Sequence, residues 1–149
     1  MALQKYNARD VDFQIEDFLS PGTWITIGGL NTFTKGHSEE TTDTTTYASA
    51  GQEESQKMQI GKTLGLQGLR LRDDTTGAGD SGQAKVEALA ERLGENSLGR
   101  VRFSHKNDTT WLVWTAHVAL GDQGGGNNDK VSWECTFTRS GAESTVAKP

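Results

Sequence analysis

Apolar and polar residues alternate along several short stretches of this chain, a pattern typical of β-strands with one buried face. Over 11–19, Val11, Phe13 and Ile15 alternate with polar residues, and a similar alternation recurs over 131–138. Such segments predict six or seven antiparallel strands. The segments are 11–19, 24–27, 32–35, 60–73, 101–106, 111–120 and 131–138.

The segment 111–120 differs from the others because both of its faces are apolar. Trp111 and Val113 share one face, whereas the other face carries Leu112, Trp114, Ala116, Val118 and Leu120. A strand that is apolar on both faces is usually covered on both sides. We expect one cover to be the domain core and the other to be the helix or a neighbouring subunit.

One segment has a helical period instead. Apolar residues recur at i, i+3, i+4 and i+7 from residue 86, which predicts a helix with one buried stripe. Asp80 or Ser81 can cap its first turn, and Gly94 is placed to end it. The stripe consists of Val86, Leu89, Ala90 and Leu93.

Glycine and proline predict two changes of chain direction. Ser20-Pro21-Gly22-Thr23 suits a type II turn, with proline at the first central position and glycine at the second. In the segment 60–73, Leu64 and Leu66 are at even positions and Leu69 and Leu71 at odd positions, so the apolar residues change from one face of the strand to the other. The switch falls at Gly68, which predicts a β-bulge there.

The stretch 37–59 has neither period. It is polar and rich in threonine, and its five carboxylates and one lysine give it a formal charge of −4. Two strands can be joined by a two-residue turn, so a 23-residue connection is unusual and is typically functional or disordered. We interpret 37–59 as a long loop that emerges between two strands.

Length and composition predict one domain. The chain has 149 residues, 33% of them hydrophobic, and its four tryptophans all fall in predicted strands. The fold class is mainly β with one α-helix: an antiparallel β-sandwich or partly closed barrel with a flanking helix and the long inter-strand loop. Residues 1–10 are interpreted as an N-terminal arm, and 140–149 as a loose C-terminal tail.

Charge and cysteine content exclude several classes. The formal net charge of −5 argues against a protein that wraps nucleic acid through phosphate contacts. A lone Cys135 excludes an internal disulfide framework and a cysteine-based zinc site, and its alternation with Trp133 and Phe137 indicates a buried, inert thiol. No apolar run is long enough for a transmembrane helix, and the first residues lack the apolar core of a secretory signal.

Candidate chemistry is sparse. Ile60-Gly61-Lys62-Thr63 lacks the upstream glycine of a phosphate-binding loop and leads into a strand. The loop 121–129 resembles a calcium loop in composition only, so a flexible hairpin loop is favoured over a cation site. The three histidines have no metal-ligand spacing. The sequence therefore predicts no catalytic residue, no metal and no cofactor, and hence no enzyme.

Four arginines on the polar faces of predicted strands leave two interpretations open. They could be solvated strand residues that guard against aggregation, or they could form ion pairs with acidic residues of a neighbouring copy. The four are Arg70, Arg72, Arg100 and Arg102.

The order of features resembles a known family, the major tail proteins, or tail tube proteins, of long-tailed bacteriophages. The resemblance covers roughly 11–145. It rests on TWITIGGLNTFTKG, a polar arm with DTTTYASAGQEES, KTLGLQGLRLRDDT, a single helix, and the late strands FSHKNDTTWLVWTAHVAL and VSWECTFTRSGAES.

The resemblance implies a structural virion protein in which six copies form a ring and stacked rings form a hollow tail tube that conducts DNA. The partners implied are further copies of the chain, the tail tip or baseplate initiator, the tape measure protein and the tail terminator, with DNA passing through the lumen without specific binding. The implied location is the virion tail, assembled in the host cytoplasm. By the same resemblance, the loop contacts other subunits through Glu39, Glu40, Thr42, Asp43, Thr44, Thr45, Tyr47, Glu53 and Glu54.

Two other classes stay open from the sequence. One is a non-catalytic β-sandwich binding module, for instance one that binds carbohydrate through an exposed Trp111 or Trp114. The other is a capsid decoration or head-completion protein, which would bind capsids instead of polymerising.

Overall fold

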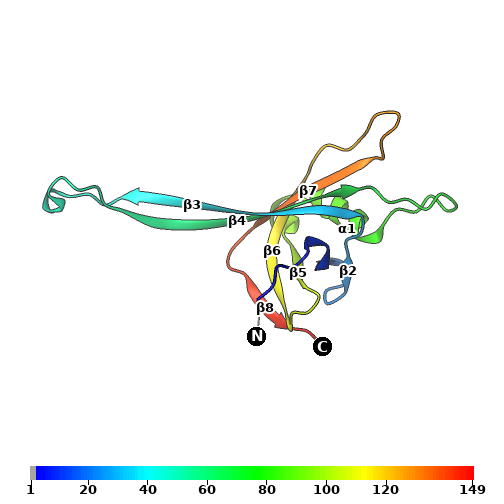
Figure 1. The fold of residues 1–149 in the computed structure, drawn as a ribbon, viewed down its shortest axis with the longest axis horizontal. Helices are drawn as coiled ribbons and strands as arrows, with labels where there is room; N and C mark the ends of the chain where they lie inside the picture. The colour runs from blue at the N-terminus through cyan, green and yellow to red at the C-terminus, as the bar shows by residue number, and fades with distance from the viewer. Residues whose placement is uncertain (1–2) are drawn as a thin grey trace.

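The computed structural model describes residues 3–149, which form one antiparallel sheet and one α-helix (Figure 1). The strands follow the order β2-β1-β5-β6-β7-β4-β3, and β8 pairs with β6. The sheet is not closed into a barrel, so the fold class is a sandwich-like β fold with a flanking helix. The strands are β1 (Val11–Glu16), β2 (Trp24–Thr26), β3 (Leu30–Asp43), β4 (Ser55–Leu69), β5 (Gly99–His105), β6 (Thr110–Leu120), β7 (Ser132–Arg139) and β8 (Ser144–Ala147). The helix is α1 (Ser81–Ala90), and short 3-10 turns are η1 (Ala8–Asp10), η2 (Tyr47–Ser49) and η3 (Gly94–Ser97).

The core draws on strands β1, β4, β5, β6 and β7 and on helix α1. Strand β6 is central to the sheet: it pairs with β5, its residues 110–113 pair with β8, and its residues 116–120 pair with β7. Most of the alternating residues predicted to point inward are buried, with Trp133 and Ile15 fully enclosed, whereas Val11, Leu112 and Leu120 are half-buried against the core. The buried cluster comprises Phe13, Ile15, Ile27, Leu64, Leu66, Val86, Leu89, Val101, Phe103, Trp114, Ala116, Val118, Trp133, Cys135 and Phe137.

Helix α1 begins as predicted and ends earlier. The Asp80 carboxylate accepts a hydrogen bond from the Gln83 backbone N–H at 3.0 Å, which is a standard N-cap. Val86 and Leu89 are buried, but the helix ends at Ala90. The prediction that Leu93 belongs to the buried stripe is therefore wrong. Leu93 has an extended backbone conformation beyond the end of the helix, and it is 86% exposed.

The interpretation of 37–59 as a loop is wrong in secondary structure. Cross-strand pairing between β3 and β4 continues from Leu30↔Gly68 out to Asp43↔Ser55, so only 44–54 connects the strands. Water reaches both faces of this ribbon, hence no alternation of apolar and polar residues marks it. The threonine-rich composition of 37–59 suits a strand as well as a loop, because threonine is β-branched.

The interpretation of 140–149 as a loose tail is also wrong. Strand β8 pairs with the first half of β6, from Val113↔Ser144 to Thr110↔Ala147. Its residues are exposed, so the sequence carries no apolar signal for the pairing. The backbone groups of β6 supply the hydrogen bonds that order this segment.

The two faces of β6 are covered in different ways. The core covers Trp114, Ala116 and Val118, as expected. On the opposite face Trp111 is 8% exposed, and the cationic groups of Arg102 and Lys148 lie over its ring. Within the subunit, the second cover is therefore made by long cationic side chains and not by the helix.

The predicted type II turn is present. The Thr23 N–H donates to the Ser20 carbonyl at 3.1 Å, and Gly22 has a φ of 94°. The bulge was predicted at Gly68 in β4, but it lies in the partner strand β3. The pairing register shifts between Leu30↔Gly68 and Thr32↔Gln67, so the extra residue is in β3, opposite Gly68.

We expect Gly68→Ala to destabilise the fold, because an added Cβ would overlap the Gly29 carbonyl and lie 2.7 Å from the Leu30 Cα. Overpacking of this kind costs about 1–3 kcal/mol. The matched control is Gly65→Ala on the same strand, where the nearest atom would be 3.8 Å away. Chemical denaturation should separate the two variants, and equal midpoints would contradict the close packing of the hairpin base.

Candidate assembly hairpin and its anchor

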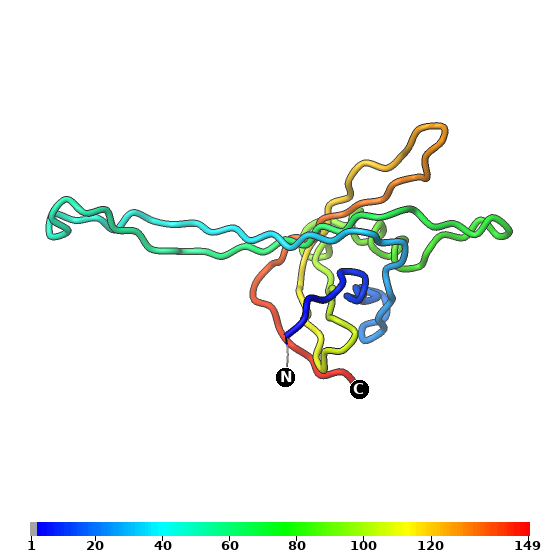
Figure 2. Tube along the Cα trace, in the orientation of Figure 1, coloured from blue at the N-terminus to red at the C-terminus, as the bar shows by residue number. Residues whose placement is uncertain are grey.

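The β3–β4 hairpin projects far from the rest of the molecule, as Figures 1 and 2 show. Strand β7 supports β4 only from Thr63 to Leu69. Distal to Thr63, among residues 3–149, the two strands pair only with each other, and neither outer edge has a partner strand. Met58 and Ile60 on this distal part are 63% and 53% exposed. A long exposed ribbon with free edges is a surface for strand pairing or docking between chains.

The tip of the hairpin has a defined shape. The Asp43 carboxylate accepts from the Thr45 N–H at 2.9 Å, and the hydrogen bonds from Thr45 lower the pKa of Asp43. The Thr45 hydroxyl accepts from the Glu54 N–H at 2.9 Å, which closes the base of the turn. Thr46 and Ser49 form a capping box around η2. This ordered turn presents Tyr47 fully to solvent.

The hairpin carboxylates differ in their surroundings. Glu39 lies 2.8 Å from the Lys57 ammonium and 2.9 Å from the His37 ring, and the hydrogen bond from Lys57 and then that from His37 lower its pKa. The side chains of Glu40, Glu53 and Glu54 form no ion pair with any group of residues 3–149. Thr42 and Thr44 lie in the same distal part and are exposed and half-buried respectively. All the loop residues predicted from the sequence thus gather on the distal hairpin.

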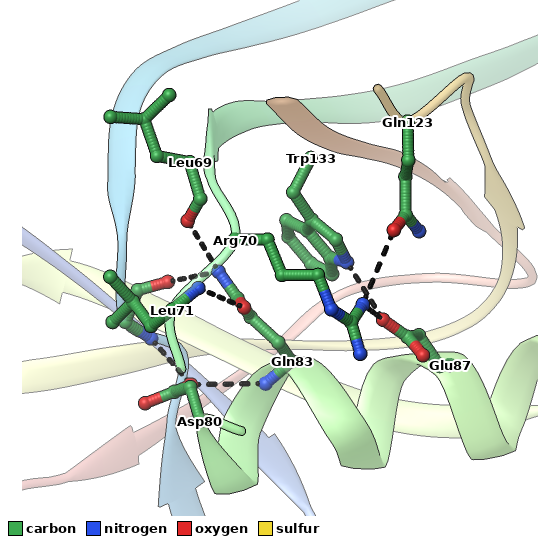
Figure 3. Close-up of polar contacts among 9 residues, drawn as sticks. Leu69, Arg70, Leu71, Asp80, Gln83, Glu87, Gln123 and Trp133 are labelled. Atoms are coloured by element: carbon green, nitrogen blue, oxygen red, sulfur yellow. Dashed lines mark hydrogen bonds and ion pairs between the residues drawn. The ribbon is translucent and has the colours of Figure 1, made fainter. Parts of the chain in front are cut away.

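The base of the hairpin is anchored to α1 by one buried amide, drawn in Figure 3. Gln83 is 1% exposed, and its Nε2 donates to the Gly28 carbonyl at 3.0 Å and to the Leu69 carbonyl at 2.9 Å. Its Oε1 accepts from the Leu71 N–H at 3.2 Å. Asp80 also accepts from the Gly28 N–H at 3.0 Å. The chain entering β3 and the chain leaving β4 are therefore fixed to one helix.

A second contact joins the same helix to the core. The Glu87 carboxylate accepts from the Trp133 indole N–H at 3.2 Å and pairs with the Arg70 guanidinium (Figure 3). Arg70 also donates to the Gln123 side chain at 3.2 Å. These contacts hold β7 and the loop after β6 against α1, and they stiffen the base from which the hairpin projects.

Gln83 and Glu87 were not among the residues predicted from the sequence. A signal for Gln83 existed, since it lies three residues before Val86 and so extends the buried stripe backwards. A glutamine on a buried stripe needs partners for its amide, and backbone carbonyls are the commonest source. Nothing local marks Glu87, whose partners are 17 and 46 residues away along the chain.

Three of the four predicted arginines already have partners inside the subunit. Arg70 pairs with Glu87, and Arg100 lies 2.9 Å from the Glu16 carboxylate. Arg102 donates to the neutral Gln14 side chain at 2.7 Å. Burial and, secondarily, the charge of Arg100 lower the pKa of Arg102.

The fourth arginine, Arg72, follows β4 in a loop closed by an isolated bridge to Gly79. No ion pair joins it to another residue of the described chain.

The other candidate sites are unremarkable in geometry. In the loop after β6, the Asp129 carboxylate accepts from the Gly126 N–H at 3.1 Å, as in a simple turn. No group of three histidine, cysteine or acidic side chains within residues 3–149 is placed to hold a metal ion. Burial, with a smaller contribution from Glu134, raises the pKa of the Cys135 thiol to about 12. No helix of the described chain is long and apolar enough to cross a bilayer.

Taken together, these features define a sandwich-like β subunit with a rigidly anchored, projecting hairpin. No protein-family model matches the sequence, and no curated protein matches it.

Solved structures do match, over nearly the whole chain. A chain in the tail of an empty gene transfer agent particle, computed with C6 symmetry, is 20% identical with a TM-score of 0.70, and the match covers 96% of this chain and 100% of that one. A chain of the SPP1 tail tube is 13% identical with a TM-score of 0.67, covering 97% of this chain and 80% of that one. A chain of the six-fold symmetrised baseplate of the anti-feeding prophage is 11% identical with a TM-score of 0.63, covering 99% and 98%. The fold predicted from the resemblance to tail proteins is therefore confirmed.

Proposed function

We propose that this chain is a structural subunit of a viral tail tube. The observation that carries the proposal is the match of almost its full length to chains from a C6-symmetric tail and from a tail tube. In this role six copies form a ring, and rings stack into a hollow tube that conducts DNA. The role is structural and involves no catalysis and no cofactor.

The projecting hairpin supports self-assembly as the main interaction. Its distal part contributes nothing to the subunit core, and it presents free strand edges and exposed Met58 and Ile60. Such a ribbon gains partners when another copy covers it. Each hairpin therefore reaches a neighbouring subunit. The tail tip or baseplate initiator, the tape measure protein and the terminator are the expected partners at the ends and inside the tube.

The net charge supports a channel through which DNA passes without binding. The chain carries a formal charge of −5, and a ring of such subunits repels phosphates instead of neutralising them. The carbohydrate-binding alternative loses its site, because Trp111 and Trp114 are 8% and 2% exposed and offer no aromatic platform.

The proposal is tested by negative-stain electron microscopy of the purified protein over a concentration series, with sedimentation velocity alongside. We expect hollow tubes or six-fold rings that increase with concentration. A monomer at every concentration that instead decorates capsids would contradict the proposal and favour the capsid decoration alternative.

A further inference from the structure

A row of alternating cationic and aromatic side chains crosses the sheet face opposite the core. The Lys148 ammonium lies 4.7 Å from the Trp111 ring centroid, and the Arg102 guanidinium lies 4.5 Å from the same ring and 4.3 Å from that of Trp24. Arg100 continues the row at 5.4 Å from Trp24. We call these five residues the Arg–Trp patch. Tryptophan and arginine are the residues most enriched among those that dominate binding energy at protein interfaces.

Two cations of the Arg–Trp patch have no carboxylate partner within the described chain. Glu16 neutralises Arg100, whereas Arg102 binds the neutral Gln14 and the Lys148 ammonium donates to the His105 carbonyl at 3.0 Å. The carboxylate of Asp12 is also exposed on this face, but no ion pair joins it to either cation. Stacking between two indoles holds the Arg102 guanidinium in a fixed position.

The hairpin tip has the complementary chemistry. Glu53 and Glu54 are exposed and form no ion pair with any group of residues 3–149, and they follow an ordered turn that presents Tyr47. The tip is fixed at the far end of a straight ribbon, remote from β6 and β8 of its own chain (Figure 2). Within one molecule the two surfaces therefore cannot meet.

We infer that the Arg–Trp patch of one copy binds the hairpin tip, residues 44–54, of a second copy. The carboxylates of Glu53 and Glu54 pair with Arg102 and Lys148, and Tyr47 packs beside Val146, which is 43% exposed next to Trp111. Charge-assisted hydrogen bonds between arginine and carboxylate are about twice as strong as neutral ones. Both partners are ordered before contact, so little conformational entropy is lost on binding. This inference rests on the proposed self-assembly and assigns the surface that receives the hairpin.

Disulfide trapping tests the contact directly. Protein carrying Ala48→Cys, beside Tyr47, is mixed with protein carrying Val146→Cys and oxidised mildly at pH 8. The native Cys135 does not compete, because its thiol is buried and its pKa of about 12 keeps it protonated. In the control, protein carrying Leu93→Cys takes the place of protein carrying Val146→Cys. Leu93 lies just beyond the end of the helix and is more exposed than Val146. We expect a disulfide-linked dimer with Val146→Cys and at least tenfold less with Leu93→Cys.

A charge reversal tests the chemistry of the same contact. Glu53→Lys with Glu54→Lys, added to the Ala48→Cys protein, should reduce cross-linking to Val146→Cys by at least tenfold. The control reverses Glu91 and Glu95, two exposed carboxylates near the end of α1. Equal cross-linking in both reversed proteins would overturn the inference.

The outcomes separate this inference from the proposed function. Normal tubes without the Val146→Cys cross-link would overturn the assigned surface and leave the tail tube role intact. The cross-link without tubes or rings would support the contact between the hairpin tip and the Arg–Trp patch and would overturn the tail tube role. Equal yields with Val146→Cys and Leu93→Cys would mean random collision and would overturn the inference.

Discussion

A chain whose distal hairpin is replaced by a tight turn is expected to fold normally and to remain a monomer. The change removes Glu40 to Gln59 and joins Glu39 to Ile60, its cross-strand partner, through Asn-Gly. Asn-Gly favours the two-residue turn that continues an antiparallel pair. None of the removed residues is buried, so the free energy of unfolding should change by about 0.5 kcal/mol or less.

The expected loss of assembly is complete, because the removed segment contains every predicted inter-subunit residue of the hairpin except Glu39. Electron microscopy and sedimentation measure assembly, and thermal unfolding measures the fold. The matched control trims the loop after β4 in the same way, replacing Asp73 to Ala78 by Asn-Gly between the bridged residues Arg72 and Gly79. We expect this control to form tubes. If the protein with the trimmed hairpin formed tubes of normal length, the hairpin would not be required for assembly.

The second large effect is expected at the anchor. Gln83→Met keeps the length and nearly the volume of the side chain but removes its amide. The carbonyls of Gly28 and Leu69 and the N–H of Leu71 then lose their partner in a buried site. An unsatisfied buried polar group costs about 1–3 kcal/mol, so the three together should lower the free energy of unfolding by about 3 kcal/mol or more.

Denaturant and thermal unfolding of the subunit measure this effect. A loss of that size lowers the Tm by roughly 6–12 °C for a domain of this length. The control is Gln123→Ala, because Gln123 is exposed and its side chain accepts from Arg70 at the surface. An unchanged midpoint for Gln83→Met would show that the buried amide does not hold the hairpin base. A reduced yield of tubes from this variant would follow from a hairpin whose direction is no longer fixed.

The half-buried elements were predictable from the sequence alone. Val11, Phe13 and Ile15 in β1, and Trp133, Cys135 and Phe137 in β7, alternate with polar residues because a strand that is buried on one face needs that period. Asp80 was predictable as a helix cap, since capping is a local property of a few consecutive residues. The mainly β fold class followed from these elements.

Only the tertiary structure decided the remaining features. The distal hairpin and β8 are strands without an apolar face, and their order comes from hydrogen bonds to a neighbouring strand, which leave no pattern in the sequence. The partners of Gln83 and of Arg102 are also non-local: the fold brings them together from positions up to 88 residues apart. The sequence thus determined which segments are buried, because burial follows apolar periodicity. The three-dimensional fold determined where the polar segments pair, because hydrogen bonding constrains the backbone and not the side-chain type.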